Sequence, residues 1–214
     1  MSNRTIPLVD LSKFVNGDEK EREAFVEQLG EAFHNVGFVG VINHGVPKEL
    51  IDGFFQSSKN FFSLPVSVKK HYEIPEMAGQ RGYTSFGREH AKQSKVADLK
   101  EFYQFGQYVE DDEVLAQKYP PNPFVEEMPS FSENAEKLYK AFEAAGGHLL
   151  RAIAIHLNLP EDYFKDKIHN GNSILRSIHY PPITEEPETA IRAEQHEDIN
   201  LITLLVGASA GGLQ

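Results

Sequence analysis

The sequence predicts an α+β fold, in which a helical and mixed N-terminal part precedes the start of an all-β part. Apolar residues recur at helical spacing from Ala135 to Leu157, which predicts one long helix. After residue 172 the period of the apolar pattern changes from 3.6 to 2, as in strands. With 214 residues, of which 40% are hydrophobic, the chain is long enough to bury a sizeable core.

The first part of the chain alternates short strands with helices. Residues 6–12 predict a short strand, and Asp18 with Glu21 forms the capping-box pattern that opens a helix. Residues 37–45, which lie between glycines, predict a buried strand, and Pro47 opens a second helix. The apolar side of this second helix is expected to carry Leu50, Phe54, Phe55, Phe61 and Phe62.

The sequence after residue 80 predicts one proline-rich loop, the long helix and several strands. Residues 118–129 carry four prolines and predict that loop. Ser130 and Glu133 can then form the capping box of the long helix, which Pro160 ends. The remaining expected elements are strands at 80–86, 101–106, 173–180 and 200–206 and a short helix at 161–167.

Charge and composition argue against several classes of function. Lys and Arg number 21 against 32 Asp and Glu, and the net charge of −11 argues against nucleic acid, because phosphate binding needs a basic face. The absence of cysteine excludes disulfides, thiolate metal sites and cysteine nucleophiles. No apolar run approaches the ~18 residues of a membrane span, and the first residues lack the apolar stretch of a signal peptide. We therefore expect no membrane association and a cytoplasmic location.

One short motif, His196-Glu-Asp198, has the spacing of a metal site. Residues i and i+2 of an extended segment face the same way, so His196 and Asp198 can offer an imidazole and a carboxylate to one ion. This is half of the two-histidine, one-carboxylate triad that holds iron(II), although copper and zinc also accept imidazole. The bare pattern also fits a solvated turn, and His71-Tyr-Glu73 repeats it. The context favours a site, because the triplet ends a polar loop and leads into the apolar residues 201–206.

Several ordered blocks of this sequence resemble the isopenicillin N synthase-like branch of the iron(II)/2-oxoglutarate-dependent oxygenases. The first blocks are Ile6-Pro-Leu-Val-Asp-Leu, Gly37-Phe-Val-Gly-Val-Ile-Asn-His-Gly-Val-Pro47 and Phe61-Phe-Ser-Leu-Pro65 with Lys69 and Lys70. Arg81-Gly-Tyr83, Asp98-Leu-Lys-Glu-Phe102 and Leu175-Arg-Ser-Ile-His-Tyr-Pro-Pro182 follow. The last blocks are His196-Glu-Asp-Ile-Asn-Leu-Ile-Thr-Leu-Leu205 and Gly211-Gly-Leu-Gln214.

This resemblance implies a double-stranded β-helix, or jelly roll, behind a helical N-terminal region. It implies metal ligation by His196 and Asp198, and a hydrogen bond from the Tyr180 hydroxyl to the 2-oxoglutarate carboxylate. Tyr180 also fits a half-buried strand tyrosine. Arg176 shares a strand face with Tyr180 and fits either the barrel interior or a structural ion pair. The resemblance makes His44 a structural residue.

The resemblance also predicts what the sequence does not contain. The second histidine ligand and the Arg-x-Ser that binds 2-oxoglutarate would follow Gln214, and a jelly roll needs about eight strands. We therefore expect the C-terminal strands to be missing from this chain. The expected divisions are a non-haem dioxygenase region at 1–120, a long helical segment at 121–172, and an incomplete jelly roll at 173–214.

The implied function is oxidation of an unidentified small molecule by O₂, coupled to oxidative decarboxylation of 2-oxoglutarate. Iron(II) is the expected cofactor, 2-oxoglutarate the cosubstrate, and ascorbate a reductant. Residues 80–84 are the expected wall on the substrate side. Two alternatives remain open at this point: an oxidase of the same family that does not use 2-oxoglutarate, and a jelly-roll binding module with a decayed metal site.

Overall fold

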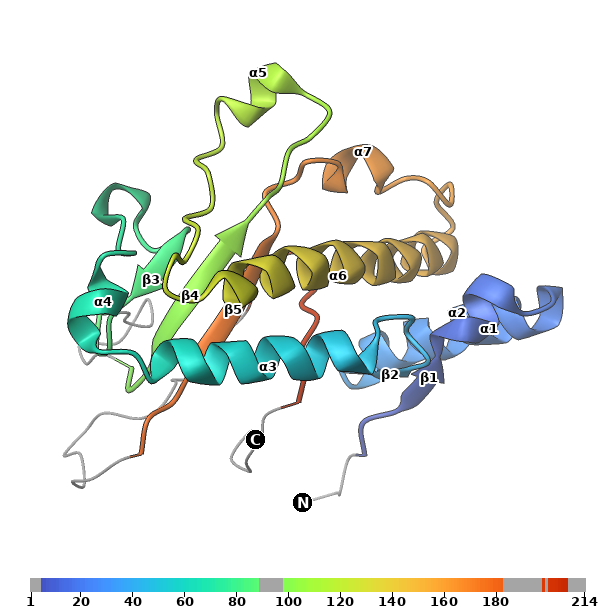
Figure 1. Ribbon diagram of the computed structural model, residues 1–214. Coiled ribbons are helices and arrows are strands. Elements are labelled where there is room, and N and C mark those ends of the chain that lie inside the picture. The colour runs from blue at the N-terminus through green and yellow to red at the C-terminus, as the bar shows by residue number, and fades with distance from the viewer. Residues whose placement is uncertain (1–4, 89–97, 183–197, 199, 208–214) are drawn as a thin grey trace.

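The computed structural model describes residues 5–88, 98–182, 198 and 200–207. Its centre is a three-stranded antiparallel sheet in the order β3-β4-β5, crossed by the long helices α3 and α6 (Figure 1). A parallel pair, β1-β2, lies at the other end of α3 (Figure 1). The strands are β1 Leu8–Asp10, β2 Gly40–Ile42, β3 Gly82–Thr84, β4 Glu101–Gly106 and β5 Ile174–His179. The helices are α1 Leu11–Asn16, α2 Glu19–Asn35, α3 Lys48–Phe62, α4 Val66–Lys70, η1 Pro75–Met77, α5 Glu113–Ala116, α6 Pro129–His156 and α7 Lys165–Ile168. The predicted α+β class is confirmed.

The first strand ends earlier than predicted, because its last residue caps a helix. The Asp10 carboxylate accepts hydrogen bonds from the Ser12 backbone N–H at 3.0 Å and from the Ser12 hydroxyl at 2.6 Å. Such a cap satisfies an N–H group that has no partner within the helix. The strand prediction is therefore wrong for Leu11 and Ser12, which begin α1. The predicted capping box of Asp18 and Glu21 is confirmed at the start of α2.

The second strand is shorter and more exposed than predicted. Left-handed backbone at Gly37 (φ 81°), Asn43 (φ 50°) and Gly45 (φ 78°) restricts β2 to three residues. Ile42 is 47% exposed, because β1 is its only strand partner among the described residues. A strand is therefore present in this segment, but the prediction that it is buried is wrong.

Aromatic side chains of α3, α6 and β4 form one part of the core. The rings of Phe61 and Phe131 stack at 4.7 Å, and the ring of Phe61 meets that of Tyr103 edge-on at 5.1 Å. Phe54 is buried as predicted, whereas Phe55 is 43% exposed. One residue turns a helix by about 100°, so Phe55 points away from the face that carries Phe54 and Phe61.

The sheet has one face toward the helices and one face away from them. β4 was predicted with the correct bounds, and all six of its residues are buried. It pairs with β5 in a register that sets Glu101 opposite His179 and Gln104 opposite Arg176. Because side chains alternate, Glu101 and His179 share the face of the core, while Arg176 lies on the other face, hereafter the outer face. The strand expected at 80–86 is limited to β3.

The long helix begins two residues earlier than predicted and without the expected capping box. Pro129 occupies its first turn, and Met128 stands at the N-cap without a side-chain hydrogen bond. Ser130 therefore lies inside the helix, where its side chain cannot cap the first turn. At the other end, Leu157 is 53% exposed, so the buried stripe stops before the predicted end. The short helix after it, α7, begins four residues later than expected.

Residues 200–207 do not form the predicted strand. They form neither a strand nor a helix, although exposed and half-buried residues alternate along them with the expected period of two. Ile202 and Leu204 pack toward Gly146 of α6, where a Cβ would lie 3.4 Å from Leu204 Cδ1. A strand needs hydrogen bonds from a neighbour, and here the neighbour is a helix.

The jelly roll itself remains a prediction. The described part of the chain holds only the sheets β1-β2 and β3-β4-β5, which are fewer strands than a jelly roll needs. In the same part, no helix is both long and apolar enough to cross a membrane.

Candidate functional site

Tyr180 follows directly after the last residue of β5. Its side chain is 38% exposed. By strand alternation it continues the outer face of the sheet, which also carries Arg176 and Ile178. The guanidinium of Arg176 lies over the ring of Phe102, 4.3 Å from its centroid. Arg176 thus makes a cation–π contact on the outer face, and the shared face of Arg176 and Tyr180 stays a prediction, since Tyr180 lies one residue beyond the strand.

Asp198 lies in a compact polar turn at the start of the C-terminal segment. Its Oδ2 accepts a short hydrogen bond from the Thr203 hydroxyl. The Asn200 amide donates to Thr203 Oγ1 at 3.0 Å and to the Ile202 carbonyl at 2.8 Å. These bonds fix how the exposed Asp198 carboxylate is oriented. His196 lies outside the described residues, so its position relative to Asp198 stays a prediction.

On the core face, at the last pair of the β4–β5 ladder, lies a polar group that we call the Glu101 cluster: Lys69, Tyr83, Glu101 and His179. The Glu101 side chain is 6% exposed, and its Oε2 accepts from Lys69 Nζ at 2.7 Å and from the Tyr83 hydroxyl. Its Oε1 lies 2.7 Å from His179 Nδ1. Since a carboxylate only accepts, Nδ1 is the nitrogen of His179 that carries the proton. Lys69 also donates to the Phe62 carbonyl at 3.0 Å.

Electrostatics keep the Glu101 carboxylate charged. Burial by itself would raise the pKa of Glu101, but the hydrogen bonds from Lys69, Tyr83 and His179, together with the charge of Lys69, hold it below its usual value. Burial, and then the hydrogen bond to Glu101, raises the pKa of Tyr83 far above its usual value. The cluster is therefore an ion pair with a neutral tyrosine donor.

The Glu101 cluster was missed as a unit in the sequence, although its residues stand in blocks that resemble the family. A usable indication was present: Glu101 begins a run of apolar and aromatic residues that is buried throughout. A charged residue in such a strand must find a partner, because an unpaired buried charge is strongly unfavourable. The partner, Lys69, lies 32 positions earlier in the chain, and no local pattern links the two.

Residues 80–84, the expected wall on the substrate side, are partly buried in the described structure, and their contact with a substrate stays a prediction. Arg81 is 1% exposed and Tyr83 3% exposed. Arg81 donates to the Gln80 carbonyl at 2.8 Å and to Asn172 Oδ1 at 3.0 Å, and burial lowers its pKa. His44 has the structural role that was expected, since its Nδ1 accepts the Val46 backbone N–H at 3.1 Å.

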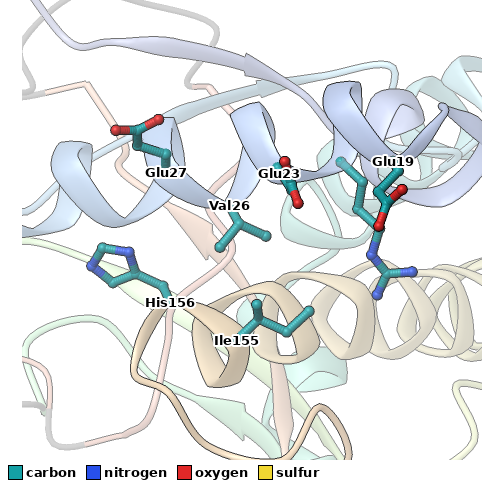
Figure 2. Close-up of a pocket in the computed structure, with 7 residues that line it drawn as sticks. Glu19, Glu23, Val26, Glu27, Ile155 and His156 are labelled. Carbon is teal, nitrogen blue, oxygen red and sulfur yellow. The ribbon is translucent and has the colours of Figure 1, made fainter.

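Two surface hollows lie apart from Tyr180 and Asp198. The first has a volume of about 390 Å³, and Figure 2 shows Glu19, Glu23 and Glu27 of α2 along it, with Ile155 and His156 from the end of α6 on the other side. The second, of about 470 Å³, is lined by residues of the segment after β4, α6 and α7, with Glu143 among them. Neither hollow includes Tyr180 or Asp198. Among the described residues, no three histidine, aspartate or glutamate side chains gather as a metal site.

More than half of the chain matches a known protein family. Residues 6–127 match the family described as non-haem dioxygenase in morphine synthesis N-terminal. The 2-oxoglutarate-dependent dioxygenase frbA of Dothideomycetidae sp. (strain 11243) is 32% identical over 98% of this chain and 65% of its own length. The proline hydroxylase buaE of Petromyces alliaceus is 34% identical over 96% of this chain and 65% of its own length. The chain thus spans just under two thirds of these curated relatives.

Solved structures agree with this match. A 2OG-Fe(II) oxygenase family protein from Caulobacter crescentus has 35% sequence identity and a TM-score of 0.74, and the alignment covers 85% of this chain and 58% of that one. A full-length Neurospora crassa protein solved in complex with alpha-KG has 28% identity and a TM-score of 0.67, over 85% of this chain and 53% of that one. The described arrangement of helices and sheet is therefore shared with structures of this kind.

Proposed function

Because this chain belongs to the iron(II)/2-oxoglutarate oxygenase family, we propose that its protein couples oxidative decarboxylation of 2-oxoglutarate to oxidation of a small molecule. The observation that carries the proposal is the match of 98% of the chain to a 2-oxoglutarate-dependent dioxygenase. The relatives' names favour this function over the two alternatives, the oxidase without 2-oxoglutarate and the binding module.

We propose His196 and Asp198 as two of three iron(II) ligands. An imidazole and a carboxylate two residues apart are the donors that iron(II) accepts on one face, with positions left open for other ligands. The described geometry fits, because Asp198 is an exposed carboxylate whose orientation is held by the Thr203 hydroxyl. Ligating carboxylates depend on such outer hydrogen bonds. Bound iron(II) would supply the site for O₂ and cosubstrate.

We propose that the Tyr180 hydroxyl donates a hydrogen bond to a carboxylate of 2-oxoglutarate. The support is its place at the end of β5, on the outer face, with its ring partly exposed. The cation of Arg176 on the same face makes this surface suitable for an anionic cosubstrate. Phe102 beneath Arg176 limits the rotation of that side chain and so helps to orient its charge.

The remaining parts of the proposal concern the whole protein. We propose that residues 173–214 are the incomplete start of a jelly roll, preceded by the N-terminal region (1–120) and the helical segment (121–172). Ascorbate is proposed as a reductant that keeps the iron in its divalent state, and a cytoplasmic location is retained. The substrate is a small organic molecule, since neither nucleic acid nor a membrane fits the charge and the apolar pattern of the chain.

Succinate formation tests the proposed function. The full-length protein is incubated with iron(II), ascorbate, O₂ and 2-oxoglutarate, and succinate is measured by mass spectrometry. We expect slow formation of succinate even without the true substrate, because this half of the reaction needs only metal, cosubstrate and O₂. The absence of succinate, with O₂ still consumed when candidate substrates are added, would favour the oxidase instead.

A further inference from the structure

We infer that Glu101 and His179 are positioning residues that set the direction of Tyr180 and thereby the affinity for 2-oxoglutarate. The inference rests on the proposed function of Tyr180 and goes beyond it. It assigns a purpose to the Glu101 cluster, to which the proposed function gives no role.

The first step is the register of the sheet. Glu101 is the first residue of β4 and lies directly opposite His179, the last residue of β5. Beyond this pair the ladder between β4 and β5 stops, so Tyr180 is the first residue that this ladder does not hold. The backbone of Tyr180 therefore continues from the last residue that the ladder fixes.

The second step is the number of elements that hold His179. Its Nδ1 donates to Glu101 Oε1 at 2.7 Å, and its ring stacks on Phe62 of α3 at 5.2 Å between centroids. Glu101 is itself held by Lys69 of α4 and by the Tyr83 hydroxyl of β3. Helices α3 and α4 and strands β3, β4 and β5 thus converge on the last pair of the ladder.

The third step is alternation along the strand. Successive side chains of a strand point to opposite faces, so a ring fixed on the core side at His179 directs Tyr180 to the outer side. A buried charged pair that is hydrogen-bonded to several elements resists rotation, because rotation would leave an uncompensated charge. The hydroxyl of Tyr180 is then presented in one direction, which is what a hydrogen bond to a small anion requires.

The experiment measures the dissociation constant for 2-oxoglutarate by calorimetry, without O₂, on the full-length protein loaded with iron(II). His179→Phe keeps the ring that stacks on Phe62 and removes the donor to Glu101. His179→Asn keeps a donor at nearly the same position. We expect His179→Phe to weaken 2-oxoglutarate binding by up to about tenfold, in line with the partial loss of a hydrogen bond to a charged group. We expect His179→Asn to restore most of that loss.

The same His179 substitution, made in a protein that already carries Tyr180→Phe, tests whether the effect acts through the Tyr180 hydroxyl. In a Tyr180→Phe protein the hydroxyl is already absent, so His179→Phe should cause no further loss of affinity. His169→Phe is the matched control, since His169 also pairs with a carboxylate, Asp111 at 3.2 Å, but at the exposed surface near α7. If His179→Phe does not fold, as judged by thermal unfolding, Tyr83→Phe replaces it. That variant removes one hydrogen bond to Glu101 without changing β5. We expect a smaller loss of 2-oxoglutarate affinity than with His179→Phe, and again no loss in the Tyr180→Phe background.

The outcomes are distinct. An equal loss of affinity in the wild-type and Tyr180→Phe backgrounds, or no loss at all, would overturn the positioning role. A wild-type protein that does not bind 2-oxoglutarate would overturn the proposed function and this inference with it, and that failure is seen before any variant is made. Weaker binding in His179→Phe, rescue by His179→Asn and no effect in the Tyr180→Phe background would support the inference.

Discussion

At the scale of single residues, the hydroxyl of Tyr180 is the group whose proposed role can be removed most cleanly. Tyr180→Phe keeps the ring, so packing at the end of β5 should survive. A hydrogen bond to a charged group contributes about 1.5–3 kcal/mol, so the KM for 2-oxoglutarate should rise roughly ten- to a hundredfold. Iron(II) affinity should not change, because the hydroxyl is not a metal ligand. An unchanged KM for 2-oxoglutarate in an active variant would show that Tyr180 does not bind the cosubstrate and is only a half-buried strand tyrosine.

Glu101 gives a prediction on stability. Glu101→Gln leaves Lys69, which is 4% exposed, without its carboxylate. Removing one partner of a buried ion pair destabilises a protein by about 3–5 kcal/mol, and the unfolding free energy in urea at pH 7 should fall by that order. Asp52→Asn is the control, because the pair of Lys48 and Asp52 is exposed and should contribute less than about 1 kcal/mol. Equal losses in the two variants would contradict the prediction.

The same residue makes a prediction on pH. The folded state lowers the pKa of Glu101 below 4.5, so its contribution to stability is present above that value and is lost as the pH falls through the folded pKa. The difference in unfolding free energy between wild type and Glu101→Gln should be full at pH 7 and should shrink below about pH 4.5. A difference that stays constant down to about pH 3 would argue that packing, and not charge, is what the substitution changes.

At the scale of elements, the sequence predicts what local periodicity controls. β4 and β5 were found almost to the residue, because alternation is a local property; of the two predicted capping boxes, that of α2 is present and that of α6 is not. The strand at 200–206 was wrong for the opposite reason: its alternation is present, but a strand also needs a partner, which local sequence does not specify. Asp198 and Tyr180 were selected by motif, whereas the link from Lys69 to Glu101 depends on the tertiary fold.

The packing of residues 200–207 on α6 can be tested with two neighbouring glycines. At Gly146 a Cβ would meet Leu204 at 3.4 Å and Ile202 at 4.0 Å, whereas at Gly147 nothing lies within 4 Å. Valine has the same intrinsic helix propensity at either position, so the difference between Gly146→Val and Gly147→Val reports the contact alone. We expect Gly146→Val to be less stable by about 1–3 kcal/mol, as for overpacking elsewhere, with faster proteolysis after residue 200. Equal stability of the two variants would show that the segment does not dock there.

At the scale of the whole molecule, both the outer face of the sheet and the C-terminal segment expose apolar side chains. Ile174 and Ile178 on the outer face are 40% and 41% exposed, and Leu201 and Leu205 of the C-terminal segment are 58% and 68% exposed. Single exposed apolar residues are ordinary, but apolar side chains gathered on one sheet face mark a surface that another part of a protein covers. In the proposed jelly roll, further strands would bury this face.

Expression of the 214-residue chain by itself tests whether this face needs a cover. We expect material that binds the dye ANS or aggregates, because the outer face offers apolar surface to the dye and to other copies. Ile178→Thr with Leu205→Thr should reduce the dye signal, whereas Val114→Thr should not, since Val114 is 67% exposed on the short helix α5, away from the sheet. A monomer that unfolds cooperatively without binding dye would show that these side chains are already covered. The outer face would then be closed within the 214 residues, and access of 2-oxoglutarate to Tyr180 would have to be reconsidered.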